Sequence, residues 1–125
     1  MTVLVDSDVL IEVSRARGES ILSKWSDLST SDALILFSPV NQAELWAGAR
    51  PNEHESLEEL FGALVCAPAD TEVGRRAGDY LRRYRKSHGV ELGDALIAAT
   101  AVVNGAMLWT RNRKRYPMKE LSFFD

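Results

Sequence analysis

The sequence has few of the residues that form disulfides or bind soft metal ions. Its 125 residues include one cysteine, Cys66, and two histidines, His54 and His88. A single cysteine excludes a disulfide framework and a thiolate zinc site, and its apolar surroundings favour a small core residue. We expect neither histidine to bind metal. Any metal is then held by oxygen atoms, which favours hard cations such as Mg²⁺ or Mn²⁺.

Long apolar runs and a targeting segment are also absent. No stretch approaches the ~20 apolar residues that a membrane-spanning helix needs. The N-terminus lacks the basic start of a signal peptide, and Asp6 stands where the apolar part would run. We therefore expect a cytoplasmic protein with no membrane partner. With 46% apolar and 26% charged residues, the chain is predicted to form one domain over residues 1–125.

The charge is modest and unevenly placed. A net charge of −3 argues against broad nucleic-acid binding. Basic residues are grouped, however, between Arg82 and Lys86 and between Arg111 and Arg115, and acids gather between Glu53 and Glu59. A bound metal that neutralises an acidic centre, with basic residues around it, would still allow a polyanion to bind.

Short apolar runs alternate with helical patterns along the chain. Strands are expected at 2–5, 34–37, 64–67 and 106–110, with a weak edge strand at 121–124. Helices are expected at about 7–18, 19–28, 38–48, 55–61, 70–87 and 94–103. Ser7 is expected to cap the first helix, and Ser38 with Pro39 to begin the third. The alternation predicts an α/β domain with a mostly parallel sheet.

Three acids lie where such a sheet binds its ligands, beyond the carboxyl ends of the strands. Asp6 directly follows the first strand, Glu44 lies about two turns into the helix after the second, and Asp94 begins a buried helix. Each has apolar neighbours, and a cluster of buried carboxylates needs a counter-charge. The pattern therefore predicts one acidic metal site.

Each acid also has a simpler interpretation. Asp8, two residues after Asp6, can cap the helix, can orient a metal ligand without binding the metal, or can bind the metal itself. Asp94 can complement the helix dipole, and Glu44 can pair with Arg50. The metal site is favoured because the simpler interpretations require three coincidences at one edge of the sheet.

Four local segments make the prediction more specific: Val5 to Ile11, Asn41 to Gly48, Leu92 to Ala101 and Leu108 to Asn112. In this order they resemble the signature segments of the PIN-domain nucleases, and the length resembles that of VapC-type toxins of bacterial toxin–antitoxin pairs. The resemblance implies a three-layer α/β/α sandwich with a mostly parallel central sheet, an acidic pocket for Mg²⁺ or Mn²⁺, and endoribonuclease activity. It places the family's first three acids on Asp6, Glu44 and Asp94.

The chain departs from this family after its last strand. Many members carry a fourth acid shortly after the strand's threonine, but the segment from Thr110 to Arg113 contains none. Asn112 can still ligate through its amide oxygen or hold a water. Thr110 can position the metal's water shell or be an ordinary hydroxyl at a strand end. The departure leaves the number of metal ions open.

The expected roles follow from these assignments. Asp6 and Asp94 are the main metal ligands, and Glu44 is a further ligand, direct or through water, or the base that orients the attacking water. Basic residues after the last strand are expected to contact RNA phosphates, unless they form a solvated loop: Arg111, Arg113, Lys114 and Arg115. The resemblance also implies a cognate antitoxin that places a basic side chain in the pocket, and a homodimer. Four aromatic residues are candidates for an interface or for the core: Trp25, Trp46, Tyr80 and Tyr84.

Three other protein classes are alternatives to a PIN-domain nuclease. A signalling receiver domain needs an aspartate after the third strand, where Cys66 to Pro68 stand. A dehalogenase-like phosphatase has Thr or Val at position 10, where this chain has Leu10. A catalytically inactive RNA- or protein-binding PIN-like module stays open because the fourth acid is missing.

Overall fold

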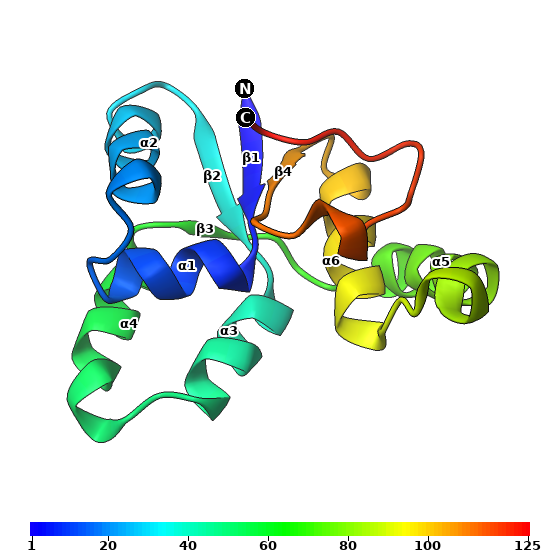
Figure 1. Cartoon of the computed structure of the whole chain (residues 1–125), viewed down its shortest axis with the longest axis horizontal. Coiled ribbons are helices and arrows are strands. Elements are labelled where there is room, and N and C mark those ends of the chain that lie inside the picture. Colours follow the sequence, from blue (N-terminus) through cyan, green and yellow to red (C-terminus); the bar gives the residue numbers. More distant parts are fainter.

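One parallel sheet of four strands organises the molecule (Figure 1). The computed structural model describes residues 1–125 and places the strands in the order β3-β2-β1-β4. The strands are β1 (Thr2–Val5), β2 (Leu34–Phe37), β3 (Val65–Cys66) and β4 (Met107–Trp109). The four predicted strands are confirmed, while the tail makes a single bridge, Phe123 to Leu108.

Six α-helices flank the sheet: α1 (Ser7–Ser14), α2 (Glu19–Ser29), α3 (Pro39–Ala47), α4 (His54–Gly62), α5 (Thr71–His88) and α6 (Leu92–Val103). Short 3₁₀ turns lie at Pro51–Glu53 and Arg113–Arg115. In Figure 1, α1 and α2 lie on one side of the sheet and α5 and α6 on the other. The α1 and α3 helices both begin at the carboxyl edge of the strands, so their first residues meet there.

The two faces of the central strand explain the layers. Successive strand residues point to opposite faces, and Val3, Leu4 and Val5 are all fully buried. Leu4 belongs to the core formed with α5 and α6, whereas Val3 and Val5 belong to the core formed with α1, α2 and α4. A strand that is apolar on both faces must be covered twice, and the predicted three-layer α/β/α sandwich is confirmed.

The structure corrects the prediction for the start of the first helix. Asp6, not Ser7, is the N-cap of α1, and its side chain accepts a hydrogen bond from the Ser7 N–H. The reason is that the helix begins immediately after the strand, so the last strand-proximal residue has the extended backbone that a cap requires. The predicted cap Ser38 is confirmed, and Asp70 caps α5 through a hydrogen bond from the Val73 N–H.

Cys66 and Tyr80 differ sharply in burial. The expectation that Cys66 is a core residue is wrong, because β3 is a two-residue edge strand and leaves both Val65 and Cys66 exposed. Tyr80, a candidate for either core or interface, is fully buried in the core with α5 and α6. None of the helices combines the length and the hydropathy required to span a bilayer.

Candidate active site

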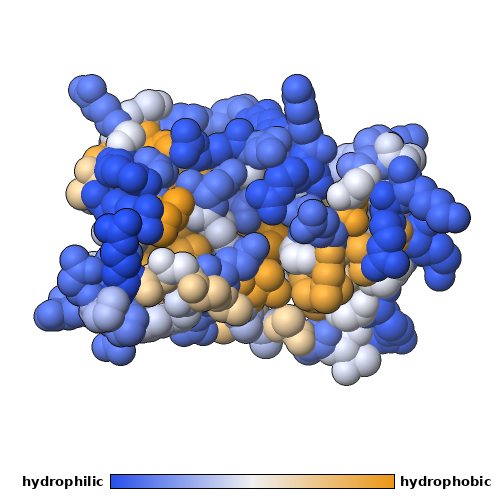
Figure 2. Space-filling model, turned by 60° about the horizontal axis from the view of Figure 1, so that its bottom comes forward, coloured by the Kyte–Doolittle hydropathy of each residue, from blue (hydrophilic) through white to orange (hydrophobic).

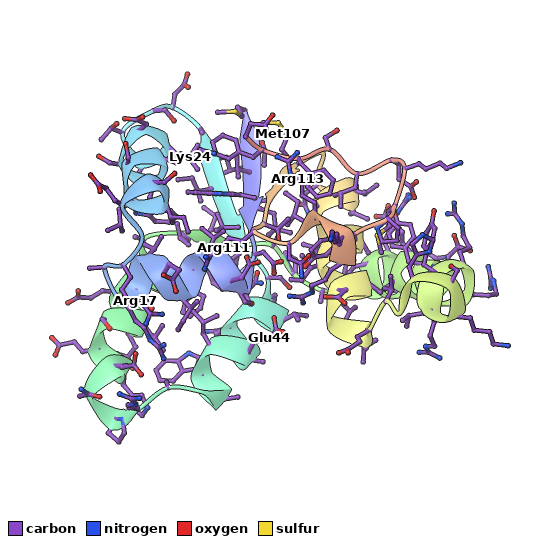
Figure 3. The ribbon with its side chains drawn as sticks, viewed as in Figure 1. Arg17, Lys24, Glu44, Met107, Arg111 and Arg113 are labelled. Atoms are coloured by element: carbon purple, nitrogen blue, oxygen red, sulfur yellow. The ribbon has the colours of Figure 1, made fainter.

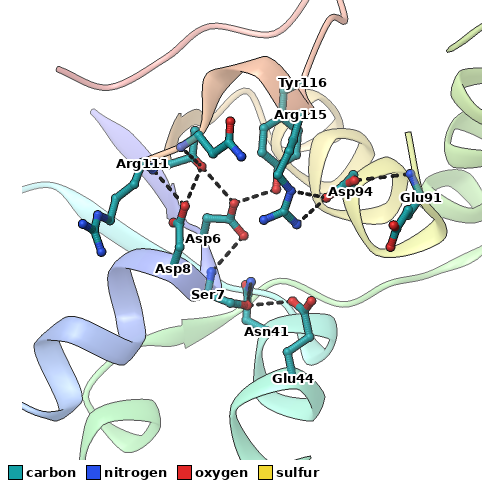
Figure 4. A network of polar contacts seen from close by, with 12 residues as sticks. Asp6, Ser7, Asp8, Asn41, Glu44, Glu91, Asp94, Arg111, Arg115 and Tyr116 are labelled. Carbon is teal, nitrogen blue, oxygen red and sulfur yellow. Dashed lines mark hydrogen bonds and ion pairs between the residues drawn. The ribbon is translucent and has the colours of Figure 1, made fainter. Parts of the chain in front are cut away.

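Asp6 is the most deeply placed acid at the carboxyl edge of the sheet. It leaves the end of β1 with 1% of its surface exposed. Its Oδ1 accepts from the Ser7 N–H at 2.8 Å, and its Oδ2 accepts from Thr110 Oγ1 at 3.0 Å and from the Tyr116 hydroxyl at 2.6 Å (Figure 4). Three donors stabilise a buried carboxylate in its charged form. The structure thus fixes the position of both Asp6 oxygens.

Asp8 lies beside Asp6 and is less well satisfied. Its Oδ2 accepts from the Arg111 N–H at 3.1 Å and from Thr110 Oγ1 at 3.3 Å, but its buried Oδ1 has no partner. A hydroxyl has one proton, so Thr110 can donate to Asp6 or to Asp8 but not to both at once. Burial, followed by the charge of Asp6, raises the pKa of Asp8 above its usual value of 3.8.

The two carboxylate oxygens of Asp94 accept hydrogen bonds from different partners. Asp94 is the third residue of α6, and its Oδ2 accepts from the Glu91 N–H at 3.2 Å in a capping-box contact at the start of the helix. Its Oδ1 faces away from the helix and accepts two hydrogen bonds from Arg115, from Nε at 2.9 Å and from Nη2. Asp94 is therefore both a capping residue and a member of the acidic cluster.

Arg115 is the one cation that reaches into this cluster. Figure 4 shows its guanidinium between Asp6 and Asp94, with Tyr116 alongside. Partial burial lowers the pKa of Arg115, but the hydrogen bonds to Asp94 and the nearby negative charges outweigh it and raise the pKa above its usual value. The side chain of Arg115 is 41% exposed, while that of Asp94 is 7% exposed.

Glu44 is positioned by a chain of hydrogen bonds between α1 and α3. Its Oε1 accepts from Ser7 Oγ at 2.7 Å, and the same Ser7 oxygen accepts from Asn41 Nδ2 at 3.0 Å. Asn41 is fully buried and its Oδ1 accepts from the Ser38 N–H at 2.9 Å. The alternative that Glu44 pairs with Arg50 is wrong, because no ion pair joins the two side chains. The Glu44 carboxylate instead lies near Gly93 in α6, where a Cβ atom added to the glycine would be 3.8 Å from Glu44 Oε2. Glu44 thus reaches the start of α6.

These acids share one edge but do not form a closed ligand set. No group of three or more His, Cys, Asp or Glu side chains lies in positions that could hold a metal ion. Asp94 and Glu44 are turned toward protein donors, as described above. The donor types nevertheless fit a hard cation, because they are carboxylates, and the unpartnered Asp8 Oδ1 is a buried oxygen that needs a positive partner.

The basic residues after β4 point in different directions (Figure 3). Arg111 extends toward α1, with its guanidinium 3.9 Å from Glu12. Arg113 pairs with Asp125 and lies over the Phe123 ring, away from the acids. Lys114 is exposed, and the Asn112 N–H donates to Thr110 Oγ1 at 3.1 Å. Arg115 is the only one of the four whose side chain forms an ion pair with the acidic cluster.

Three residues of the site were not predicted as such: Ser7 as a link to Glu44, Asn41 and Tyr116. Asn41 had a sequence signal, because it stands three residues after Ser38 at a helix start, a spacing typical of a capping box. Tyr116 had none, because its neighbours form a short 3₁₀ turn with no periodicity. Its buried hydroxyl follows only from the folded position of that turn.

A cleft of about 340 Å³ opens beside the acids, between α1 and α3. Its lining includes Ser7, Asp8 and Glu44 together with the apolar Ile11 and Leu45. Figure 2, in which the bottom of the view in Figure 1 is turned forward, shows hydrophobic residues exposed among hydrophilic ones on this face of the molecule. Asp8 and Glu44 are thus accessible from this cleft, whereas the buried Asp6 and Asp94 do not line it.

Comparison with known proteins identifies the family. The model of the PIN domain matches residues 3–121. This chain belongs to the PIN-domain family. Its similarity to curated family members is substantial: it is 42% identical to Ribonuclease VapC10 of Mycobacterium tuberculosis over 119 residues, 94% of this chain and 88% of that protein. It is 38% identical to Ribonuclease VapC19 of the same organism, over 89% of this chain and 90% of that protein.

Solved structures of toxin–antitoxin complexes have the same PIN fold. The VapBC2 structure from Rickettsia felis, bound to a DNA fragment from its promoter, has a TM-score of 0.84 at 20% identity and covers 99% of this chain and 98% of its own. The VapBC-1 structure from nontypeable Haemophilus influenzae has a TM-score of 0.81 at 21% identity, covering 100% and 98%. The family and the fold predicted from the four sequence segments are confirmed.

Proposed function

We propose that this PIN-domain protein is a metal-dependent endoribonuclease and the toxin of a toxin–antitoxin pair. The observation that carries the proposal is the row of carboxylates at the carboxyl edge of the parallel sheet, with Asp6 almost fully buried and one oxygen of Asp8 unpartnered. Buried acids without enough cations are costly to fold. Their retention here is consistent with a divalent cation, Mg²⁺ or Mn²⁺, as the missing positive charge.

The metal ligands in this proposal are Asp6 and Asp94, with Asp8 and Glu44 as further acids within reach. A divalent cation bound there would lower the pKa of a water molecule and offset charge on a phosphate. Because Asp6 is fixed by three donors and Asp94 by its helix cap, neither needs to reorganise much in order to ligate. Such preorganisation is what a catalytic metal site requires.

The remaining residues orient the reactants. Glu44, held by Ser7, is placed to accept a proton from the attacking water or to orient it. Hydrolysis adds this water to phosphorus and releases one of the two sugar oxygens as a hydroxyl. Thr110 fixes Asp6 and Asp8 and links them to Asn112. Arg111 and Lys114, on the open side of the site, are suited to phosphate contacts.

The relatives support the substrate and the partner. Curated proteins to which this chain is similar are named ribonucleases, and the solved structures with its fold include toxin–antitoxin complexes. We propose an RNA substrate, a cognate antitoxin, a homodimer and a cytoplasmic location for a single domain spanning residues 1–125. The apolar cleft beside the acids would allow an antitoxin to block the site.

The decisive experiment uses the protein purified free of any partner. Total bacterial RNA is incubated with it in the presence of Mg²⁺, of Mn²⁺ or of a chelator, and in parallel with Asp6→Asn. The matched control is Asp70→Asn, which makes the same chemical change at the N-cap of α5, away from the site. Asparagine preserves both caps, so both variants are expected to fold.

We expect discrete cleavage products with either metal and none with the chelator. Asp6→Asn should lower the rate by at least about 100-fold, since it removes a charged ligand, and Asp70→Asn should cleave as the parent does. If the folded parent and Asp6→Asn leave RNA equally intact with both metals, the catalytic proposal is wrong and a binding module is the better description. Cleavage that persists in the chelator would refute the metal dependence.

A further inference from the structure

Arg115 occupies the Asp94 carboxylate oxygen that the helix start does not use. Oδ2 accepts from the Glu91 N–H at 3.2 Å and faces the first turn of α6. Oδ1 receives both the Nε–H and the Nη2–H of Arg115. A carboxylate oxygen has two lone pairs, so the two donors use the acceptor capacity of this atom. A metal ion can bind Asp94 Oδ1 only if Arg115 gives up at least one of these bonds.

The charges of the site lead to the same competition. Asp6, Asp8 and Asp94 face one another across the edge of the sheet, and Arg115 is the only basic side chain that contacts any of them in an ion pair. It lies between Asp6 and Asp94, where a positive charge is most stabilised (Figure 4). The guanidinium thus holds the position at which an added cation would gain most.

Arg115 is also able to leave. Its side chain is 41% exposed and belongs to a short 3₁₀ turn rather than to a long helix or a strand. Moving its guanidinium into water restores hydration and gives up only a partly exposed ion pair, which contributes modestly to stability. Asp94, in contrast, is held by α6 and is only 7% exposed. Of the two partners, the arginine is the one free to move.

We propose that Arg115 is a built-in cation that competes with the divalent metal for Asp94. In the metal-free protein it pairs with Asp94 and reduces the repulsion among the acids. When a metal ion binds, Arg115 withdraws from Asp94 Oδ1 toward the open side of the site. The inference rests on the metal site proposed above and adds to it a residue that sets how tightly the metal is held.

The test measures metal binding directly, without RNA. The affinity of the full-length protein for Mn²⁺ alone is determined by calorimetry for the parent, Arg115→Ala and Arg113→Ala. Arg113→Ala is the control: it removes an equal charge from the same turn, but Arg113 pairs with Asp125 rather than with the acidic cluster. Arg115→Ala should bind Mn²⁺ about fivefold more tightly, the upper value for a partly exposed ion pair, and Arg113→Ala should bind within about twofold of the parent.

A second measurement uses the unaltered protein. The Nε–H resonance of Arg115 is followed by nuclear magnetic resonance while Mg²⁺ is added, and it should move toward the position of a solvated arginine as the metal saturates. Equal Mn²⁺ affinities for the parent and Arg115→Ala, equal gains in the two variants, or an unmoved resonance at saturation would each overturn the competition while leaving the metal site in place. If neither parent nor Arg115→Ala binds Mn²⁺, the proposed metal site itself falls, and the competition with it.

Discussion

The hydroxyl of Tyr116 offers a sensitive test of how Asp6 is held. Tyr116→Phe removes one atom from a side chain that is 3% exposed, next to a carboxylate that is 1% exposed. The lost bond is the short one, 2.6 Å from the hydroxyl to Asp6 Oδ2. Burial and the charge of Asp6 together raise the pKa of Tyr116, so the hydroxyl keeps its proton and donates across the whole working range of pH.

The size of the effect follows from the burial of both partners. A hydrogen bond to a charged group contributes roughly 1.5–3 kcal/mol, and water cannot replace the lost donor at a buried oxygen. Asp6 keeps the Ser7 N–H and a share of the Thr110 hydroxyl, so the lower part of this range applies. We expect Tyr116→Phe to lower the free energy of unfolding by about 2 kcal/mol.

Urea denaturation of the metal-free protein measures this free energy. The control is Tyr84→Phe, since the Tyr84 hydroxyl accepts a hydrogen bond from Arg83 at an exposed position and its loss should cost less than about 0.5 kcal/mol. A free energy for Tyr116→Phe within about 0.5 kcal/mol of the parent would refute the buried hydrogen bond to Asp6.

Two further predictions concern a charge and a core residue. Asp8→Asn should make the metal-free protein more stable at pH 7, because a carboxyl whose pKa is raised on folding contributes full stability only below its ordinary value of 3.8 and loses it as the pH rises through the raised value. Thermal unfolding at several pH values should show the gain vanishing toward pH 3.8; an offset that is the same at every pH would contradict this origin. Leu4→Ala, at a fully buried position in the central strand, should cost about 2–5 kcal/mol in urea denaturation. Leu34→Ala, on a strand residue that is 45% exposed, should cost less than about 1 kcal/mol, and equal losses would argue against the assignment of the core.

The layered fold was predictable because its signals are local. The β1 segment is apolar on both faces, and Ser38-Pro39 and Gly89 mark helix ends by their backbone requirements alone. The exposed Cys66 was not predictable in this way, because an apolar run has the same composition in a central strand and in an edge strand. Its burial depends on which strand becomes the edge.

The acids of the candidate site were predictable as a set, but their partners were not. Asp6, Glu44 and Asp94 follow from the rule that parallel strands present ligands at one edge. Arg115 could be placed near that edge, but nothing in the sequence distinguishes it from Arg113, only two residues earlier, which turns to Asp125 instead. The direction of a side chain in a 3₁₀ turn is decided by tertiary packing.

The hydrogen bond that joins Thr110 to Asp6 spans 104 residues of sequence, and the bond from Tyr116 spans 110. The first and last thirds of the chain therefore have to meet before the acids are arranged, since β4 completes the sheet beside β1. During translation the segment with Asp6 emerges long before the segment that fixes it. A growing chain of this PIN-domain protein therefore carries an unassembled acidic cluster until Thr110 and Tyr116 have left the ribosome and can fold against Asp6.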